Sequence, residues 1–432
     1  MSALAARAPG KLPFFVWVLA AGTFLMGTTE FVIAGILPDI APDLGVGVSH
    51  AGLLITAFAV GMIVGGPTMA LATLRLPRRL TLVLALSVFA AGHVMAALTS
   101  SFTLVLAARF VTALATGAFW AVGFVIATTA AGPANATRAV SVMMGGLTLA
   151  NVAGVPAGSL VGHVTGWRGL FWALAALAAL AAVIGRFVPR TERRAQDSVR
   201  DEVRALRQDR LWLALAAAVL IMGGVLAVYT YITPLLTDRA GLPAGAVPLV
   251  LIAFGAGALG GTAIGGRFGD RRPMATTIPA AAATALALLA LIPLSINPVA
   301  AIALIFLMAL TGFTINPVVT ALAVRFAGDA PTLASALTTS AYNTGIAAGS
   351  ALAGQALASS LGVTGPALVG AVFAGLTLLP LIALATVTNR GTIRTVVQGA
   401  RSDGDADSDG TTWLEPVTDD GYAHALDSTN GS

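Results

Sequence analysis

The sequence predicts an all-α polytopic membrane protein with twelve transmembrane helices in two pseudo-symmetric six-helix halves. Three observations lead to this fold class. The 432 residues are 57% hydrophobic and only 10% charged, whereas a soluble domain has about 25% charged residues. Twelve apolar runs follow one another, and one long polar stretch divides them six and six.

Each apolar run is long enough to cross the hydrocarbon core of a bilayer, about 30 Å thick. Lipid offers no partner to unpaired backbone groups, so even the Gly-rich and Ala-rich runs are predicted to be helices. The first run is too long for the apolar part of a signal peptide, and we expect it to be retained. The runs lie at 14–37, 51–74, 79–99, 102–130, 139–162, 170–188, 211–236, 246–266, 274–294, 298–324, 332–360 and 366–388.

These runs divide the chain into five segments. We expect a cytoplasmic N-terminus (1–13), an N-terminal six-helix half (14–188), a cytoplasmic central linker (189–210), a C-terminal six-helix half (211–388) and a disordered tail (389–432). The linker is rich in charge, which fits either an amphipathic helix on the membrane surface or a solvated connection. The tail is acidic and rich in Gly and Ser, a composition typical of disorder.

The charges of the connections alternate along the chain. Of the 24 basic residues, Arg109 lies within a run, and only Arg168 and Arg239 fall on the side opposite to all the others. Cytoplasmic loops carry the excess of Lys and Arg. We therefore expect a multi-pass protein of the cell membrane with both termini in the cytoplasm.

Glycine rows repeat between the two halves. Gly61-x-x-x-Gly65 in the second run corresponds to Gly257-x-x-x-Gly261-x-x-x-Gly265 in the eighth, at an offset of 196 residues. The fifth run has Gly154-x-x-x-Gly158-x-x-x-Gly162, and the eleventh has Gly345-x-x-x-Gly349, at an offset of 191. Such rows permit close helix packing. Two related six-helix halves are typical of secondary transporters.

Glu30 is the acidic residue that lies deep inside an apolar run. A mid-helix carboxylate in lipid costs roughly 2.5–3.5 kcal/mol on insertion scales, and such residues usually face a bundle interior or a watery cavity, where proton relays use them. The alternative is a protonated Glu that makes one helix–helix hydrogen bond. A carboxyl group that binds and releases a proton as the cavity changes sides would serve proton antiport.

Arg109 is the second deep ionisable residue. It lies seven residues after Phe102, and Glu30 lies seven residues before Leu37. At 1.5 Å per residue both are about 10 Å below the outer surface, so a pair is allowed. Arg109 would then control the proton on Glu30 and contact substrate; alternatively, it holds its own helix against neighbours.

Several less polar positions are candidates for a substrate cavity. Trp120, Tyr229 and Asn343 are predicted to bind substrate alongside Glu30 and Arg109, although each also fits ordinary packing or anchoring. His93 lies at a depth like that of Glu30, and its isolation favours plain packing. Asn316 precedes Pro317, and we interpret this pair as a kink.

Other classes of chemistry lack the residues they need. The chain has no Cys, which excludes disulfides and thiolate sites. Its four His are scattered without metal-ligand spacing. The phosphate-binding loop of an ATPase needs a Lys followed by Ser or Thr. The single lysine of this sequence, Lys11, is followed by Leu12, so that loop is absent. We expect no enzyme activity, cofactor, metal, ATP or nucleic acid.

Motifs at the connections resemble the major facilitator superfamily. Gly266-Arg-Phe-Gly-Asp270-Arg271 is similar to its G-x-x-x-D-R loop in the second-half copy, whereas the first-half copy has Leu74 where the family usually has Asp. The resemblance implies a gating role for Gly266, Asp270 and Arg271. Arg109, in Leu-x-x-Arg109-x-x-Thr, resembles the fourth-helix arginine motif.

Two further stretches narrow the resemblance to drug/proton antiporters. Gly154-Val-Pro156-Ala-Gly158 resembles their fifth-helix motif, which implies a gating role for Gly154, Pro156 and Gly158. Residues 138–172 and 27–38 are similar to arabinose-efflux-type permeases, and the Leu-Arg-Leu-Pro-Arg-Arg loop looks most like actinobacterial chloramphenicol-resistance exporters. In such relatives a first-helix Glu and the fourth-helix Arg serve proton coupling and substrate binding.

The expected function is proton-coupled efflux of small, mostly apolar drugs, with chloramphenicol first. Its partners would be the lipid bilayer, protons and the drug, and the chain would act as a monomer. One alternative is a proton-coupled exporter of sugars or nucleosides, which should have more amides and carboxylates in its cavity. Another is a non-transporting membrane sensor, which would need a folded soluble domain for output.

Overall fold

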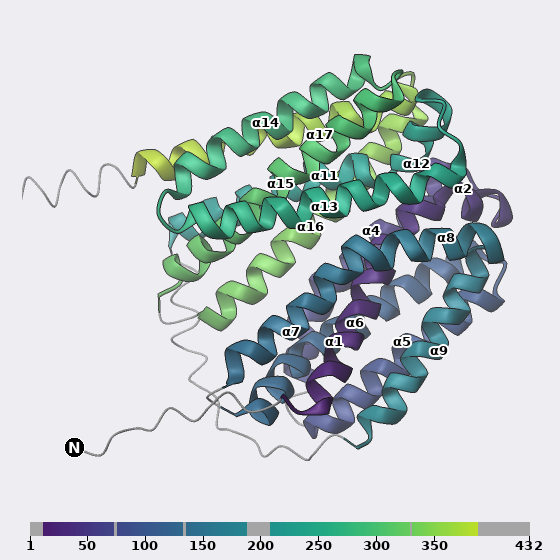
Figure 1. Cartoon of the computed structure of the whole chain (residues 1–432), viewed down its shortest axis with the longest axis vertical. Coiled ribbons are helices and arrows are strands. Elements are labelled where there is room, and N and C mark those ends of the chain that lie inside the picture. The colour runs from purple at the N-terminus through teal and green to yellow at the C-terminus, as the bar shows by residue number, and fades with distance from the viewer. Residues whose placement is uncertain (1–11, 73–75, 133–134, 188–207, 329–330, 388–432) are drawn as a thin grey trace, which may run out of the picture. The chain divides into compact units, whose positions relative to one another are not determined.

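The computed structural model describes residues 12–72, 76–132, 135–187, 208–328 and 331–387, without the side chains of residues 67, 70–72 and 331–333. No strand occurs among the residues described, and helices account for nearly all of them (Figure 1). Residues up to Leu384 belong to one compact unit; a second unit, 385–432, is described only at 385–387. Most of the predicted central linker, the predicted tail and Leu74 lie outside the described residues.

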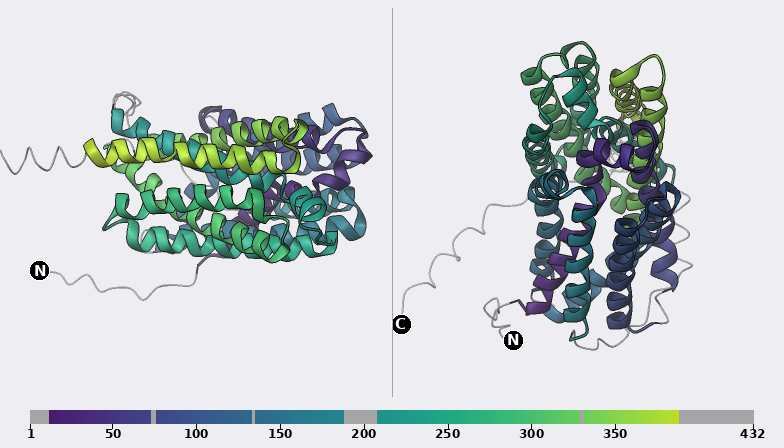
Figure 2. Two further views of the ribbon diagram at one scale, coloured as in Figure 1. Left: turned by 90° about the horizontal axis from the view of Figure 1, so that it is seen from above. Right: turned by 90° about the vertical axis from the view of Figure 1, so that its right-hand side faces the viewer.

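The first six predicted runs form helices that pack together as one bundle, purple to teal in Figures 1 and 2. Helix α6 packs against both α4 and α5, α5 packs against α9, and α1 packs against α7. The elements are α1 (Phe14–Phe31), α2 (Ile33–Asp43), α3 (Val48–Ala51), α4 (Leu53–Ala72), α5 (Arg78–Leu98), α6 (Phe102–Ala131), α7 (Ala136–Leu149), the π-helical turn η3 (Ala150–Gly154), α8 (Val155–Thr165) and α9 (Trp167–Gly185).

The last six runs form a second bundle, green to yellow, in which α15 packs against α13 and α14, and α11 packs against α16 and α17 (Figure 2). Helix resumes after Thr377 and continues to 387. The elements are α11 (Asp209–Thr230), α12 (Ile232–Pro234), η4 (Leu235–Arg239), η5 (Ala244–Ala246), α13 (Val247–Gly269), α14 (Pro273–Leu294), α15 (Pro298–Phe326), α16 (Pro331–Ala358), η6 (Gly362–Thr364) and α17 (Gly365–Leu376).

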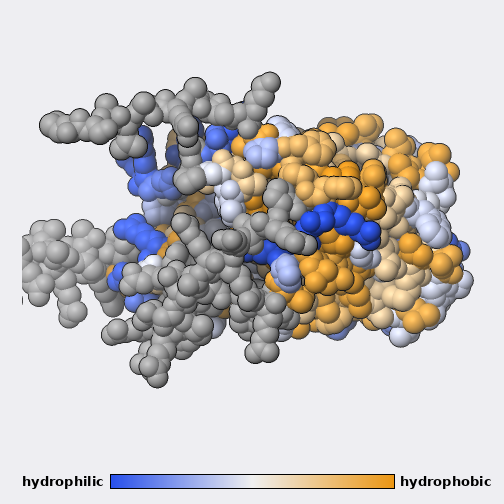
Figure 3. All heavy atoms as spheres, turned by 90° about the horizontal axis from the view of Figure 1, so that it is seen from below, coloured by the Kyte–Doolittle hydropathy of each residue, from blue (hydrophilic) through white to orange (hydrophobic). Residues whose placement is uncertain are grey.

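Helix occupies most of the described part of each predicted run. Eleven helical stretches of the described chain are long and apolar enough to cross a membrane. The remaining run is α16, which has 28 residues and is long enough, but it carries many Ser, Thr, Asn and Gln side chains. Large apolar side chains such as Leu84, Leu180 and Leu286 are exposed, and hydrophobic residues cover much of the face in Figure 3. This exterior suits lipid rather than water.

Two runs that we predicted as single helices are broken. The first run divides at Val32, where α1 ends and α2 begins, and α2 then continues beyond the predicted end to Asp43. The seventh divides at Tyr231. Both breaks precede prolines, Pro38 and Pro234, which donate no backbone hydrogen bond. The expected kink at Pro317 is not accompanied by a break, since α15 is helical throughout.

Three of the four glycine rows lie where the backbones of two helices approach each other closely, whereas the row at Gly154 meets side chains of the first run. A Cβ atom at Gly257 would lie 2.7 Å from the carbonyl oxygen of Phe306 on α15, and one at Gly61 would lie 2.8 Å from that of Phe110 on α6. Gly345 and Gly349 pack in the same manner on the backbone of α11. Without a Cβ, two backbones can come into direct contact, as the small-residue pattern predicts.

The two bundles are joined by hydrogen bonds at the end formed by α2, α3 and α12. Thr56 and Ser350 share a hydrogen bond of 2.8 Å between their hydroxyl oxygens, and Ser49 donates to the carbonyl of Gly354. Tyr231 donates to the carbonyl of Ser49 (3.1 Å), and its hydroxyl fits where Gly52 and Gly354 have no side chain. This end of the structure is therefore closed.

Candidate functional site

Glu30 occupies the last turn of α1, directly before the break at Val32. Its side chain is half-buried, and no described residue gives its carboxyl group a hydrogen bond or an ion pair. The acidic side chains that contact basic ones among the described residues are Asp39, 3.0 Å from His163 Nδ1, and Asp43, paired with Arg168. A half-buried carboxyl group without a fixed partner is free to exchange a proton or to accept a new contact.

Arg109 projects from α6 onto the residue that precedes Glu30. The side chain is only 1% exposed. Its Nη1 donates to the carbonyl of Thr29 (3.0 Å) and to Thr29 Oγ1 (3.2 Å), and Nε donates to the carbonyl of Leu54 (3.4 Å). The guanidinium carbon lies 4.3 Å from the ring centre of Phe58. The predicted pair is thus adjacent in the fold without forming an ion pair.

The Nη2 group of Arg109 is buried and has no hydrogen-bond partner. A buried donor without a partner costs about 1–3 kcal/mol, and more when it is charged. An anion, a carbonyl group or water would satisfy it. The site therefore contains one basic and one acidic group without a hydrogen-bond partner, the Nη2 of Arg109 and the carboxyl group of Glu30.

The break in the first run exposes backbone carbonyls that other helices satisfy. Tyr229 of α11 donates to the carbonyl of Phe31 (3.3 Å), and Thr233 of α12 donates to that of Ala34 (2.8 Å). The carbonyl of Ala34 needs such a donor because Pro38, four residues later, has no N–H. The segment that carries Glu30 is therefore held by both halves of the protein.

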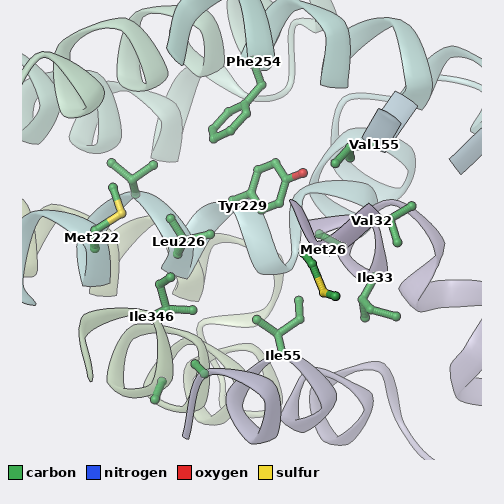
Figure 4. Close-up of a cluster of buried hydrophobic side chains, with 14 of the residues drawn as sticks. Met26, Val32, Ile33, Ile55, Val155, Met222, Leu226, Tyr229, Phe254 and Ile346 are labelled. Atoms are coloured by element: carbon green, nitrogen blue, oxygen red, sulfur yellow. The ribbon is translucent and has the colours of Figure 1, made fainter. Parts of the chain in front are cut away.

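Tyr229, a predicted substrate-binding residue, belongs to an aromatic cluster that includes Phe31, the residue after Glu30. Its ring centre lies 6.1 Å from that of Phe31 and 4.4 Å from that of Phe254, and Phe254 lies 6.0 Å from Phe313. Figure 4 shows the Tyr229 ring between Phe254 and the residues Met26, Val32 and Ile33 of the first run. The cluster offers an apolar, aromatic surface that includes Phe31, the residue after Glu30.

Neither Trp120 nor Asn343 makes a hydrogen bond to Arg109 among the described residues. Trp120 packs against a buried cluster that includes Phe58, the ring over which Arg109 lies. Trp120 is half-buried and stacks on Phe124, with ring centres 5.3 Å apart; it lies eleven residues after Arg109, about 16 Å along α6. Asn343 is buried on α16, where its Nδ2 donates to the carbonyl of Thr339 and its Oδ1 has no partner. Asn316, interpreted from sequence as a kink, also has a buried Oδ1 without a partner.

His93 was expected to be plain packing, and the structure shows it packed between aromatic rings with hydrogen bonds that the sequence did not predict. It is buried on α5 and makes two short hydrogen bonds, to Thr29 Oγ1 (2.7 Å) and to the carbonyl of Phe89 (2.8 Å). Its depth, equal to that of Glu30, is the only signal in the sequence that could have indicated this contact. Among the described residues no cluster of His, Asp or Glu could hold a metal ion.

The predicted gating residues fall into two separate groups. Gly154 and Gly158 face the break of the first run: a Cβ at Gly158 would lie 2.8 Å from Val32 Cγ2, and Gly154 packs on Thr28. Pro156 follows directly after η3, in the first turn of α8. The second group, Gly266, Asp270 and Arg271, lies at the far end of α13, where Asp270 and Arg271 are exposed.

The chain folds into two helical bundles built from twelve apolar runs. Charged and aromatic side chains gather at a broken helix between the two halves. This combination defines a polytopic membrane transporter. Residues 19–354 match the Major Facilitator Superfamily, and the chain belongs to this family. The family is one of transporters, not of enzymes.

Several known proteins are similar to the chain. It is 37% identical over 382 residues to a chloramphenicol resistance protein of Streptomyces lividans, covering 87% of this chain and 97% of that protein. It is 33% identical to the inner membrane transport protein YdhP of Escherichia coli strain K12, covering 85% and 95%, and 31% identical to the protein AraJ of the same strain, covering 59% and 64%. The predicted relationship to chloramphenicol-resistance proteins and to AraJ-type permeases is confirmed.

The fold also matches solved structures. A bacterial homologue of the human lysosomal transporter Spinster, in an inward-facing and occupied conformation, superposes with a TM-score of 0.70 at 17% identity, covering 88% of this chain and 98% of that one. The predicted fold class is confirmed.

Proposed function

We propose that the chain exports small, mostly apolar drugs in exchange for protons, with chloramphenicol as the first substrate. The observation that carries this proposal is the unpaired carboxyl group of Glu30 beside the unsatisfied, buried Nη2 of Arg109. A proton on Glu30 and a drug at the aromatic cluster would compete for one position between the two halves. The similarity to a chloramphenicol resistance protein supports this choice of substrate.

Proton exchange supplies enough free energy for useful export. One neutral drug exchanged for one proton gains about 1.4 kcal/mol per pH unit and about 2.3 kcal/mol per 100 mV. At one pH unit and 100 mV these terms support a concentration ratio of about 500-fold. In this proposal the glycine contacts of α8 and α16 let the halves close on either side, Asp270 and Arg271 act in gating, and one chain is the working unit.

A second candidate is the export of sugars or nucleosides. The buried amide oxygens of Asn316 and Asn343, which have no partner, favour substrates that carry several hydroxyl groups. The aromatic surface around Tyr229 and the small number of polar groups favour chloramphenicol, which would offer the amides both hydroxyl groups and an aromatic ring. The membrane-sensor alternative is set aside because the family is one of transporters.

Cells that express the chain should retain less chloramphenicol than cells that lack it, and a protonophore should restore retention. An expression-matched Arg109→Lys chain is the control, since a compact ammonium group cannot reproduce the three hydrogen bonds of the guanidinium. Radiolabelled chloramphenicol and arabinose are measured in parallel. Unchanged chloramphenicol retention with lowered arabinose retention would reverse the order of the two candidates.

The orientation of the chain is tested by reporter fusions. The distribution of basic residues predicts a cytoplasmic reporter after Gln196 and at the C-terminus, and an external reporter near Asp43. Alkaline phosphatase, active outside, and a fluorescent protein, active inside, read the two sides independently. An external C-terminus would contradict both the orientation and the even number of membrane crossings.

A further inference from the structure

A buried hydrogen-bond chain connects α5, α1 and α6 behind Glu30. His93 Nδ1 lies 2.8 Å from the carbonyl oxygen of Phe89, and His93 Nε2 lies 2.7 Å from Thr29 Oγ1. Arg109 Nη1 lies 3.2 Å from the same Thr29 Oγ1. His93, Thr29 and Arg109 are each only 1% exposed, so water does not compete for these bonds.

The chemistry of the donors and acceptors fixes where the protons lie. A carbonyl oxygen only accepts, so His93 Nδ1 carries a proton. A guanidinium only donates, so Thr29 Oγ1 accepts from Arg109. A neutral imidazole with its proton on Nδ1 has an acceptor at Nε2, and the single hydroxyl proton of Thr29 is available to donate to it. His93 is therefore a neutral imidazole with its proton on Nδ1.

Aromatic rings hold this imidazole in place. The ring centre of His93 lies 4.2 Å from that of Phe89 and 5.4 Å from that of Phe171. A protonated His93 would place a second cation near Arg109, and it would turn Nε2 into a donor aimed at an oxygen that already accepts from Arg109. Both effects favour the neutral imidazole.

We propose that His93 and Thr29 are positioning residues for Arg109. By accepting the Thr29 hydroxyl proton, His93 orients the lone pairs of Thr29 Oγ1 toward Arg109 and fixes the guanidinium on α1. The unpartnered Nη2 is thereby kept available to the carboxyl group or substrate beside it. The functional part of this inference rests on the proposed proton-coupled export; the hydrogen-bond chain itself does not.

The tautomer is tested without any substrate. The full chain, labelled with 15N histidine and reconstituted in lipid, should show a neutral imidazole with its proton on Nδ1 that is absent from the His93→Gln chain. The signal of His163, whose Nδ1 faces Asp39, should remain in that variant. A His93 signal with the proton on Nε2, or a fully protonated ring, would overturn the proposal. Because this readout needs no drug, it stands apart from the test of the proposed function.

Transport variants separate positioning from packing. His93→Gln keeps an amide oxygen that can accept from Thr29, whereas His93→Leu fills the space without an acceptor. Thr29→Val removes the hydroxyl group at nearly constant volume. Thr338→Val is the matched control, because the buried Thr338 hydroxyl donates to the carbonyl of Ala334 in its own helix and to no other residue that the structure describes.

We expect His93→Leu and Thr29→Val each to lower the maximal rate of proton-driven efflux about tenfold, as loss of a hydrogen bond to a charged group predicts, with little change in KM for the drug. His93→Gln should recover a large part of the rate, and the double variant should be no worse than either single one, because both remove the same interaction. Equal rates for His93→Gln and His93→Leu, or additive losses in the double variant, would show that His93 only fills space.

Discussion

Glu30→Gln should abolish proton-driven efflux while the protein remains folded in the membrane. Glutamine has nearly the same shape as glutamic acid but cannot bind or release a proton between the two sides. The half-buried position, without a hydrogen bond or ion pair to any described residue, means that no structural contact is lost with the charge. One proton supports a drug gradient of as much as about 500-fold at one pH unit and 100 mV. In the Gln variant this gradient should disappear.

The measurement is drug accumulation in inverted vesicles energised by a proton gradient. Asp238→Asn is the matched control, since it removes a carboxylate that is exposed at the end of η4, and it should transport normally. Exchange of labelled for unlabelled drug without a gradient should survive in Glu30→Gln, which separates coupling from binding. Active efflux at the normal rate in the Gln variant would remove Glu30 from the mechanism.

A cross-link between Thr56→Cys and Ser350→Cys should stop transport completely. Thr56 on α4 and Ser350 on α16 belong to different halves, and their hydroxyl oxygens lie 2.8 Å apart, close enough for a disulfide after small adjustments. Transport by two rocking halves requires this end to open. The chain has no Cys of its own, so an oxidant acts only on the introduced pair, and a reductant should restore transport.

A second pair provides the control. Thr284 on α14 and Thr311 on α15 are joined by a hydroxyl–hydroxyl hydrogen bond of 2.7 Å within the same half. Oxidised Thr284→Cys/Thr311→Cys should still transport, because helices of one half move together. Normal transport by the fully cross-linked Thr56→Cys/Ser350→Cys protein would show that these helices need not separate, and failure to cross-link would show that the closed arrangement is rarely occupied.

The sequence predicted the membrane-spanning runs well, because the thickness of the bilayer dictates their length and because lipid excludes unpaired backbone groups. The same constraint made Glu30 and Arg109 visible: a charged residue in an apolar run is costly and therefore informative. The glycine rows were visible for a related reason, since only residues without a side chain allow two backbones to touch.

Other features depended on which faces of distant helices meet. Glu30 and Arg109 were placed at equal depth from sequence, yet depth does not fix rotation about a helix axis, and Arg109 in fact binds Thr29. The break at Val32 depends on donors from Tyr229 and Thr233, about 200 residues further along the chain. His93 carried no pattern of its own.

The sequence by itself therefore determined where the apolar helix-forming runs lie, which charged residues lie among them and which helices can approach closely. Only the tertiary structure decided which donor meets which acceptor: Arg109 and His93 on Thr29, Tyr229 on the carbonyl of Phe31, Thr56 on Ser350. Hydropathy is a property of a segment and can be summed along the chain. A hydrogen bond depends on distance and angle between two groups, and these are set only when helices far apart in sequence pack against each other.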